Sequence, residues 1–356
     1  MNTYYIKKND FADFVSRLSK EFKTYYLKSD ESDFYWKKSQ RRILYWQEYK
    51  GNLDGLIIGW VRANDPLKQF IFSSKEKVSE DFKSLESKDK PLLLIGAKNC
   101  DLASLDILDY VFMQGDFKDP FYINRRQSTF IIASDCTEPL DICFCKALGR
   151  EAFPTKNYDM ALADIGEGYV VEIGSQKALD HFSKFISKFM KVSNAQLEER
   201  QKIRRSTNIK LDENIKKHQI PQSSQLKDIM KKGFSSGVWE EEIKTCVECG
   251  CCNFICPTCH CFFLGDSKEA NRNIRHKIWD ACLYKDFAVV AGGANPRKRL
   301  FQRLRNRYDK KFEFFPNVLG MIACTGCGRC ISGCPAKIDI RRILKNLVAE
   351  TAVVKK

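Results

Sequence analysis

Residues 246–257 read CVECGCCNFICP, and residues 324–335 read CTGCGRCISGCP. Both stretches fit the pattern C-x2-C-x2-C-x3-C-P, which is the run that bacterial ferredoxins use to bind [4Fe–4S] clusters. The alternative is structural zinc, but zinc sites usually combine two C-x2-C pairs rather than four cysteines that end in Cys-Pro. The repeated run therefore predicts a domain that binds two [4Fe–4S] clusters and passes single electrons.

The spacing within each run also predicts which cysteines share a cluster. Three thiolates on one tight loop reach three irons of one cube, and the fourth cysteine typically ligates the cluster of the other run. Gly250, Gly326 and Gly328 are expected to let the backbone approach the cube closely. The predicted ligand sets are Cys246, Cys249, Cys252 and Cys334 for one cluster, and Cys324, Cys327, Cys330 and Cys256 for the other.

The composition predicts a basic protein of a reducing cytosol, and the lability of the predicted clusters favours an environment poor in oxygen. The 356 residues include 16 cysteines and carry a formal charge of +15. The cysteines are clustered in a long chain, unlike the framework of a short secreted protein, and the N-terminus has no apolar signal core. No run of about 18 apolar residues is present, so no membrane span is expected. The thiolate-bound clusters offset part of the basic excess, and the rest is expected to attract acidic protein partners.

Other ligands are not expected from the sequence. No groove-reading motif accompanies the positive charge, so nucleic acid is not an expected partner. No glycine-rich loop of the nucleotide-binding kind follows a strand, so the chain is not expected to bind NAD or FAD unaided.

The first half of the chain predicts an α/β domain. Apolar runs at 91–97 and 129–133 are typical of buried strands, and the segment 102–112 between them has helical spacing. Residues 10–18 have the spacing of an amphipathic helix, and residues 160–173 are expected to form a hairpin around Gly166 and Gly168. Shorter apolar runs at 56–60 and 69–72 are also predicted to be strands.

The overall prediction is an α+β protein in which an N-terminal α/β domain precedes a C-terminal helical two-cluster ferredoxin domain. The predicted ranges are 1–190 for the α/β domain, 191–245 for a charged helical connector and 246–356 for the cluster domain. A long insert separates the two cysteine runs, and within it residues 268–283 are predicted to be helical. Residues 340–348 have one apolar helical face.

A second group of cysteines lies in the first half of the chain, at Cys100, Cys136, Cys143 and Cys145. Cys100 and Cys136 each follow a predicted strand, and α/β sheets place their ligands at the carboxyl ends of strands. The four thiols are therefore candidates for a third [4Fe–4S] cluster, or for a site that reduces a small sulfur compound. The alternative is that they are ordinary buried cysteines, which are common in protein cores.

Two further features leave alternatives open. Cys251, Cys259, Cys261 and Cys282 lie outside the predicted ligand sets, and are alternative ligands, a thiol site or core packing. The basic residues of 297–311 form a solvated helix face, a docking surface, or a set of cations that raise the potential of a cluster.

Several short elements together resemble a known family. The chain is similar to the beta subunits of soluble sulfhydrogenases and to the corresponding iron–sulfur subunits of anaerobic sulfite reductases, from about Gly96 to Ile340. The elements that carry the resemblance are GAKNCDL (96–102), DCTEP (135–139), CFC (143–145), CPTC (256–259), WDAC (279–282), NPR (295–297) and CTGCGRC (324–330).

The resemblance implies an electron-transfer subunit of a cytoplasmic complex rather than an enzyme in its own right. It implies one partner that contains flavin and binds NAD(P), and a second, catalytic partner. That second partner is a hydrogenase, a sulfite reductase or a heterodisulfide-reductase-like module. The resemblance also favours the third cluster, because the family's elements contain a cysteine here at each of the four positions. The alternative function is a catalytic reductase of a small sulfur compound at these N-terminal cysteines.

Overall fold

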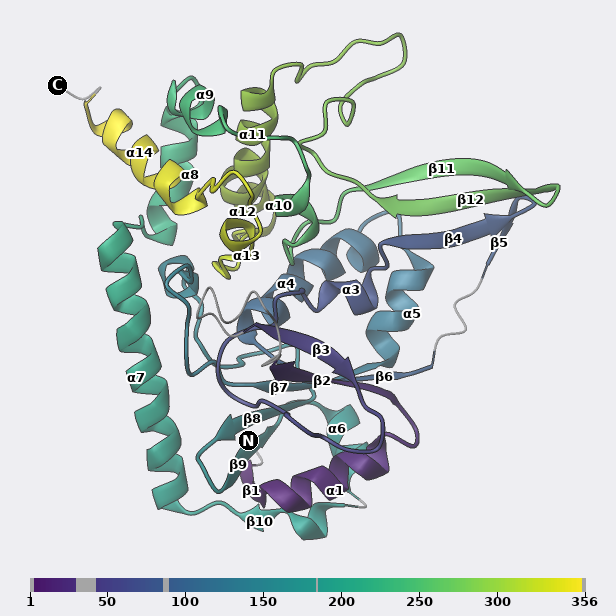
Figure 1. Ribbon diagram of the computed structural model, residues 1–356, viewed down its shortest axis with the longest axis vertical. Coiled ribbons are helices and arrows are strands. Elements are labelled where there is room, and N and C mark those ends of the chain that lie inside the picture. The colour runs from purple at the N-terminus through teal and green to yellow at the C-terminus, as the bar shows by residue number, and fades with distance from the viewer. Residues whose placement is uncertain (1–2, 30–42, 86–89, 184, 354–356) are drawn as a thin grey trace. The chain divides into compact units, whose positions relative to one another are not determined.

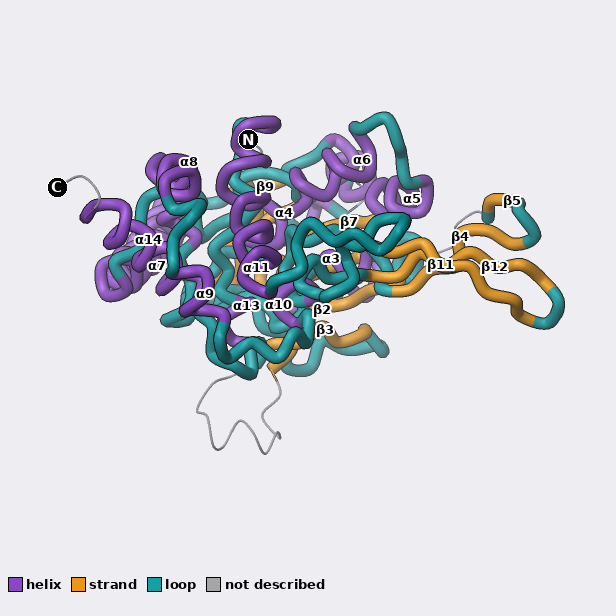
Figure 2. Tube along the Cα trace, turned by 90° about the horizontal axis from the view of Figure 1, so that it is seen from above, coloured by secondary structure: helices purple, strands orange, loops and turns teal. Residues whose placement is uncertain are grey.

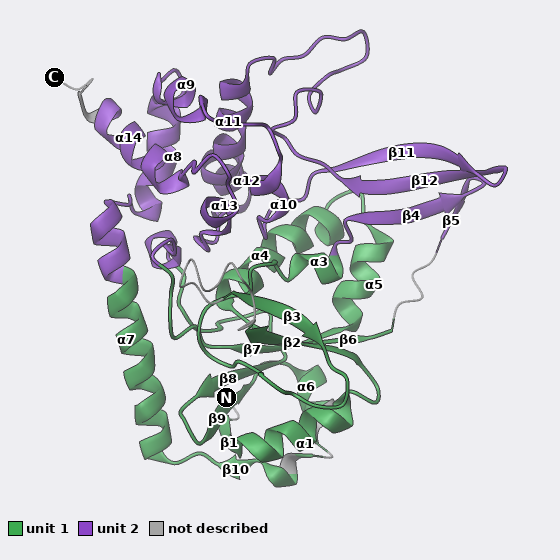
Figure 3. Cartoon of the chain, viewed as in Figure 1, with its two compact units in different colours: residues 1–71, 87–140, 150–211 green, residues 72–86, 141–149, 212–356 purple. Residues whose placement is uncertain are grey.

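The computed structural model describes residues 3–29, 43–85, 90–183 and 185–353, and divides them into two compact units (Figures 1 and 3). Unit 1 comprises residues 1–71, 87–140 and 150–211, and unit 2 comprises residues 72–86, 141–149 and 212–356. The expected α+β class is confirmed. The predicted linear ranges 1–190, 191–245 and 246–356 stay a prediction.

Unit 1 is built on an eight-stranded mixed sheet with the order β10-β1-β9-β8-β7-β6-β2-β3. Strands β2, β6, β7 and β8 are parallel, and the strands on either side of them are antiparallel. The strands are β1 (Thr3–Lys7), β2 (Lys23–Ser29), β3 (Leu44–Glu48), β6 (Leu92–Ala97), β7 (Thr129–Ser134), β8 (Met160–Asp164), β9 (Gly168–Ile173) and β10 (Met190–Lys191).

Helices connect these strands. They are α1 (Lys8–Leu18), α3 (Lys68–Ile71), α4 (Asn99–Asp109), which continues as a π-helical turn over Tyr110–Gln114, α5 (Pro120–Ser128), α6 (Gln176–Phe182), a 3-10 turn over Ile186–Lys188, and α7 (Asn194–His218), which continues into unit 2.

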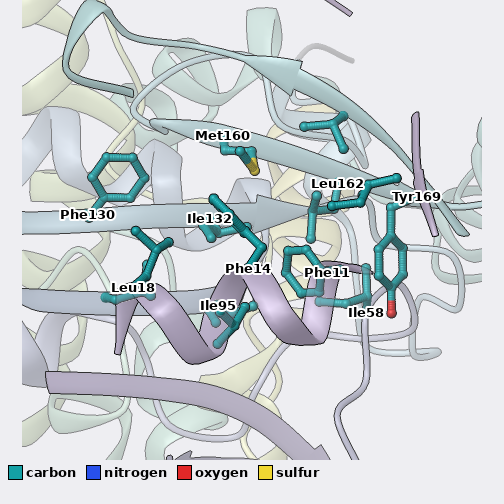
Figure 4. Close-up of a cluster of buried hydrophobic side chains, with 14 of the residues drawn as sticks. Phe11, Phe14, Leu18, Ile58, Ile95, Phe130, Ile132, Met160, Leu162 and Tyr169 are labelled. Atoms are coloured by element: carbon teal, nitrogen blue, oxygen red, sulfur yellow. The ribbon is translucent and has the colours of Figure 1, made fainter. Parts of the chain in front are cut away.

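The core of unit 1 lies between α1 and one face of the sheet (Figure 4). Phe11, Phe14 and Leu18 project from α1 at helical spacing and pack against strand residues that include Ile95 and Ile132. Burying one such side chain contributes roughly 1.5–3 kcal/mol, so this one face accounts for much of the stability of the unit. The predicted helix at 10–18, the strands at 91–97 and 129–133, and the hairpin at 160–173 are all confirmed.

Unit 2 combines short helices with a four-stranded antiparallel sheet in the order β11-β12-β4-β5, which is visible in Figure 1; Figure 2 shows the same strands from above. The strands are β4 (Lys75–Glu80), β5 (Lys83–Ser84), β11 (Phe262–Glu269) and β12 (Arg272–Trp279). The helices are a 3-10 turn over Cys145–Leu148, α8 (Ser223–Lys232), α9 (Val238–Ile243), α10 (Cys251–Phe254), α11 (Leu300–Asp309), a π-helical turn over Lys310–Phe314, α12 (Phe315–Leu319), α13 (Arg329–Ser332) and α14 (Ile340–Val353).

A second core in unit 2 supports the cysteine loops. Trp239 of α9 is fully buried, contacts Tyr308 of α11 at a ring distance of 5.4 Å, and donates its indole N–H to Gly233 O at 2.7 Å. Apolar residues of α14, including Ile343 and Leu347, complete this core, as the periodicity of 340–348 predicts. Short helices wrapped around the loops give the cysteines a fixed frame.

The insert between the cysteine runs corrects one prediction. Residues 268–283, expected to be helical, lie largely in the β11–β12 hairpin. Ala270 and Asn271 both have positive φ, which is the two-residue turn that matches the twist of a hairpin. The pairs Lys277–Glu76 and Trp279–Phe72 then join the hairpin to β4 and the residues before it. Pairing with strands distant in sequence, rather than local helix propensity, determines the secondary structure of this segment.

Two predictions of short strands are also wrong. Residues 56–60 form a loop with a single bridge between Leu56 and Lys28, and residues 69–72 include most of the helix α3. Short apolar runs do not distinguish strand from helix. In α3, Phe70 packs on the rings of Tyr25 and Trp46, a contact that fixes the helical form. No helix of the described residues is both long and apolar enough to cross a membrane.

Candidate iron–sulfur centres

The first predicted ligand set lines a single cavity in unit 2 that opens to solvent; the cavity and the solvent at its mouth together leave about 570 Å³ not filled by protein atoms. Two sulfurs of this set accept backbone N–H groups, Cys246 from Glu248 and Cys334 from Ile338, each at 3.4 Å. The structure thus brings a cysteine of the second run beside the first run, as the crossed pairing requires. The members that line the cavity are Cys246, Cys249, Cys252 and Cys334.

The second predicted set lines another cavity of unit 2, which together with the solvent at its mouth leaves about 300 Å³ unfilled. Cys256 Sγ lies 3.2 Å from the Thr258 hydroxyl and 3.4 Å from Lys311 Nζ. The two cavities share Arg307, Cys330 and Ile340 in their walls. The members that line the second cavity are Cys256, Cys324, Cys327 and Cys330.

Burial makes these thiols poor anions on their own. It raises the pKa of Cys252 to about 11 and that of Cys324 to about 11, because a thiolate loses its hydration inside the protein. Iron binds thiolates, so cluster insertion would have to displace these protons. Among the described residues, no three His, Cys, Asp or Glu side chains converge as a single metal ion would require. A cube places its thiolates on four different irons, so its ligands surround it rather than meet at a point.

Buried cations face both cavities. Arg307 is 4% exposed and donates Nη2 to Cys252 O at 2.8 Å, while its Nε has no hydrogen-bond partner among the described residues. The hydroxyl of Thr325, which lines the second cavity, is likewise buried with no partner in the described part of the chain. Buried polar groups are nearly always bonded, and an anionic cluster with sulfide and thiolate acceptors would satisfy both. The residues present therefore fit [4Fe–4S] clusters.

Spacing explains why these cations point inward. Arg303, Arg307 and Lys311 are four residues apart, lie on one face of the helix and are all buried. Arg303 pairs with Glu248 in the first cysteine run at 2.7 Å. Of the alternatives for the basic segment, a solvated face is therefore wrong for these three residues. Their proximity to the predicted ligands favours an effect on cluster potential.

The variant Lys311→Met tests the effect of a buried cation on the cluster potential. Lys311 Nζ donates to Thr258 Oγ1 at 2.9 Å and to Ala323 O at 3.0 Å, and lies 3.4 Å from Cys256 Sγ. Lys311→Met removes a charge that stabilises the more negative, reduced cluster, so the potential of that cluster should fall. A charge several ångströms away is worth roughly 2 kcal/mol at an effective dielectric of about 20, which corresponds to a fall on the order of 50–100 mV.

The measurement for Lys311→Met is a redox titration followed by EPR. Lys345→Met is the control, because Lys345 lies exposed on α14 and its charge is screened by solvent. An unchanged potential in Lys311→Met with the iron content intact would contradict the assignment of Lys311 to this cluster.

The second cysteine loop is in close contact with the segment 141–149. Gly326 and Gly328 have φ of +65° and +70°, and an added Cβ would lie 2.5 Å from Cys145 N and 2.5 Å from Ile142 O, respectively. Phe144 N donates to Gly326 O at 2.8 Å, and Cys143 Sγ lies 4.0 Å from Cys327 O. These glycines therefore allow close approach to another backbone segment.

The structure assigns the four N-terminal cysteines to different units. Cys143 and Cys145 are part of unit 2, whereas Cys100 and Cys136 are part of unit 1. Cys100 lies in the first turn of α4, which follows β6, and Cys136 lies two residues beyond β7, both as predicted. That the four hold one cluster stays a prediction.

A buried lysine accompanies the two cysteines of unit 1. Lys98 is 1% exposed, and its ammonium group contacts Gly59 O, Ser134 Oγ at 2.6 Å and Asp135 O at 2.9 Å. Burial lowers the pKa of Lys98 to about 8, against the opposing influence of the nearby Cys136, Asp135 and Cys100. Lys98 thus places a buried cation beside two of the four cysteines. The sequence analysis did not single out Lys98 as a candidate site residue. Its position directly after an apolar strand was a signal that its ammonium group could be buried.

Comparison with known proteins supports the cluster prediction. Residues 245–338 match the family model described as a 4Fe-4S dicluster domain. The chain carries a 4Fe-4S dicluster domain. The matched range includes all eight cysteines of the two runs. This match supports an iron–sulfur protein of the electron-transfer class.

The chain also resembles a curated protein over most of its length. It is 29% identical over 301 residues to the sulfhydrogenase 2 subunit beta of Pyrococcus furiosus, which is 83% of this chain and 87% of that protein. The family resemblance expected from the short sequence elements is thereby confirmed. No solved structure matches the chain.

Proposed function

We propose that this chain is an iron–sulfur electron-transfer subunit of a cytoplasmic oxidoreductase complex. It would relay single electrons between a partner that binds flavin and NAD(P) and a catalytic redox partner, the latter a hydrogenase, a sulfite reductase or a heterodisulfide-reductase-like module. The name of the Pyrococcus furiosus relative, a subunit of a sulfhydrogenase, supports membership of such a complex.

The observation that carries the proposal is the pair of neighbouring cavities in unit 2. Each is lined by one crossed set of four cysteines, and Arg307 and Cys330 contribute to both walls. A shared wall favours electron transfer between two clusters, because the centres that it separates are close. A [4Fe–4S] cluster carries one electron at a time, and its reduction potential depends on nearby charge, hydrogen bonds to its sulfurs and solvent exposure.

The chain's own residues would tune and insulate these carriers. Backbone N–H groups of Glu248 and Ile338 donate to cysteine sulfurs, and Arg307 and Lys311 add positive charge nearby. All of these favour the reduced state. The apolar residues that line the first cavity limit access of water, and they include Ile243, Leu283 and Ile340.

A third [4Fe–4S] cluster at Cys100, Cys136, Cys143 and Cys145 is part of the proposal. Its support is the buried Lys98 beside Cys100 and Cys136, together with the resemblance to the sulfhydrogenase relative. A closed set of four thiolates leaves no open coordination position, so we propose a relay there rather than a catalytic site.

Iron and sulfide analysis of the anaerobically purified chain tests the cluster count. Two clusters predict about eight irons per chain and three predict about twelve. The double variant Cys100→Ser/Cys136→Ser should lose about four irons if the third cluster exists, and none otherwise. Fewer than about four irons per wild-type chain, with no EPR signal on reduction, would refute the relay.

A second experiment tests the partners. The tagged chain, isolated anaerobically from its own cells, should co-purify with a flavin-containing protein and a catalytic redox protein. Reduction of its clusters by NAD(P)H should require the flavin-containing partner. Isolation of an iron-replete chain with no associated redox protein would contradict the proposed complex.

A further inference from the structure

A third cavity of unit 2 is lined by cysteines that neither predicted cluster uses. It opens to solvent, and the cavity and the solvent at its mouth together leave about 350 Å³ unfilled; Asn253 and Thr258 form part of its wall. The cysteines are Cys259, Cys261 and Cys282, and the cationic side chains of the wall are Arg307, Lys310 and Lys311. Arg307 therefore lines this cavity as well as the two cluster cavities.

The β11–β12 hairpin explains how Cys261 and Cys282 come together. Phe262 and Trp279 are the outermost pair of the ladder, and beyond them Asp280 N donates to Cys261 O at 3.0 Å. Cys261 thus lies at the base of one strand, and Cys282 follows the base of the other by three residues. A long hairpin holds the two residues opposite one another, although they are far apart in sequence.

The thiols of the cavity are arranged in pairs. Cys261 and Cys282 line the same side of the cavity and lie close enough for each thiol to shift the pKa of the other, and Cys259 stands in the same relation to Cys256, a predicted ligand of the second cluster. Thiolates on different irons of one cube are held apart by the cube, whereas Cys261 and Cys282 are near neighbours with no cube predicted between them. This proximity favours direct sulfur–sulfur chemistry over a further cluster.

We propose that Cys261 and Cys282 are a redox-active thiol pair that alternates between a dithiol and a disulfide. On oxidation of this thiol–thiolate pair the S–H bond of Cys261 breaks, one S–S bond forms, and two electrons and one proton leave. On reduction two electrons and one proton return, the S–S bond breaks, and the Cys261 thiol and the Cys282 thiolate are restored. The clusters of the same unit supply or accept the electrons one at a time, so this coupling rests on the proposed function.

The surroundings of the pair suit thiol–disulfide exchange. Asn253 Nδ2 donates to Cys282 Sγ at 3.1 Å, and Cys261 is partly exposed while Cys282 is 4% exposed. The hydrogen bond from Cys261, reinforced by Arg307, lowers the pKa of Cys282 to about 6. The same contact, with burial, raises the pKa of Cys261. One thiolate and one thiol at neutral pH are the reactants that disulfide exchange needs.

The pair would store two electrons beside one-electron carriers. The pair would collect single electrons from the iron–sulfur clusters and deliver them two at a time to a reaction that proceeds in two-electron steps. The cationic wall would also stabilise the Cys282 thiolate while it waits for oxidation.

The test is a thiol titration of the full, cluster-loaded chain. Anaerobic protein is equilibrated in a series of dithiothreitol buffers from fully reduced to fully oxidised, trapped with N-ethylmaleimide, and analysed by peptide mass spectrometry. Cys261 and Cys282 should lose alkylation together in one two-electron transition, with a disulfide-linked peptide as the product. Alkylation of both cysteines across the whole series would overturn the proposal.

Single variants separate this pair from a cluster. In Cys282→Ser, Cys261 should remain alkylated in every buffer, while iron content and the EPR of the clusters equal those of wild type. Cys251→Ser is the matched control and should leave the transition unchanged. A loss of about four irons in Cys261→Ser or Cys282→Ser would identify these residues as cluster ligands and overturn the thiol pair. Dithiothreitol sets the potential, so the result does not depend on electron transfer to partners.

Discussion

Cys334→Ala is expected to remove the cluster that the first cysteine run holds, although Cys334 belongs to the second run. Its sulfur lines the same cavity as Cys246, Cys249 and Cys252. A cubane with a ligand missing is labile, so iron content should fall by about four irons per chain. The EPR signal of the remaining cluster should lose the broadening that arises from interaction with its neighbour.

The reciprocal variant makes the prediction specific. Cys256→Ala should remove the other cluster, because Cys256 lines the cavity of Cys324, Cys327 and Cys330. The two variants should therefore retain clusters with different EPR spectra and different potentials. Uncrossed ligation, in which each run holds its own cluster, predicts the opposite assignment of the two remaining signals.

Cys251→Ala is the matched control for these variants. Cys251 also lines the first cavity, but lies at the start of α10 outside the predicted set. It should keep the full iron content. Loss of the first cluster in Cys251→Ala, with retention in Cys334→Ala, would show that Cys251 is the fourth ligand.

The cluster-binding loops could be predicted from the sequence because their geometry is local. Three cysteines within about seven residues have few ways to face one centre, so their spacing alone predicts a cluster-binding loop. Both predicted loops lie within residues 245–338, the range that matches the dicluster model. The crossed placement of Cys256 and Cys334 could also be predicted, since the fourth cysteine of such runs serves the other cluster. The cavities are consistent with that placement.

Contacts distant in sequence were not predictable in this way. Cys143 and Cys145 were expected within the α/β domain, but the segment 141–149 packs on the loop of Gly326 and Gly328. No local pattern announces such a contact. The hairpin at 262–279 was missed for a related reason, because the partner strand β4 is almost two hundred residues earlier. Its turn residues, Ala270 and Asn271, are not the Asn-Gly or Asp-Gly pair that marks a two-residue hairpin in sequence, so no strong local signal was present.

Lys98, Arg307 and Lys311 illustrate a further limit. A basic residue in sequence is most often solvated, and only the packing shows that these three are buried beside cysteines. The four-residue spacing of Arg303, Arg307 and Lys311 was available as a hint. Which face of the helix turned inward depended on the rest of unit 2.

Gly326→Ala is expected to abolish or severely weaken the second cluster site. The φ of +65° costs an L-residue about 1–2 kcal/mol, and the added Cβ would lie 2.5 Å from Cys145 N and 2.7 Å from Phe144 C. These are backbone atoms, so no side chain can rotate away. Overpacking of this kind adds roughly 1–3 kcal/mol and would force the loop of Cys324 and Cys327 away from the segment 141–149.

The measurements for Gly326→Ala are iron per chain and the thermal midpoint Tm of unfolding under anaerobic conditions. Gly320→Ala separates strain from collision, because Gly320 has a φ of +66° but no atom lies within 4 Å of an added Cβ. That control should lose only the conformational part, about 1–2 kcal/mol, and keep its iron. If Gly326→Ala lowered Tm no more than Gly320→Ala and retained its clusters, the close packing of 141–149 on the Cys324 loop would be wrong. A larger loss of Tm and iron in Gly326→Ala than in Gly320→Ala would show that the second cluster depends on the packing of segment 141–149 against its loop. The spacing of the cysteines alone does not reveal this dependence.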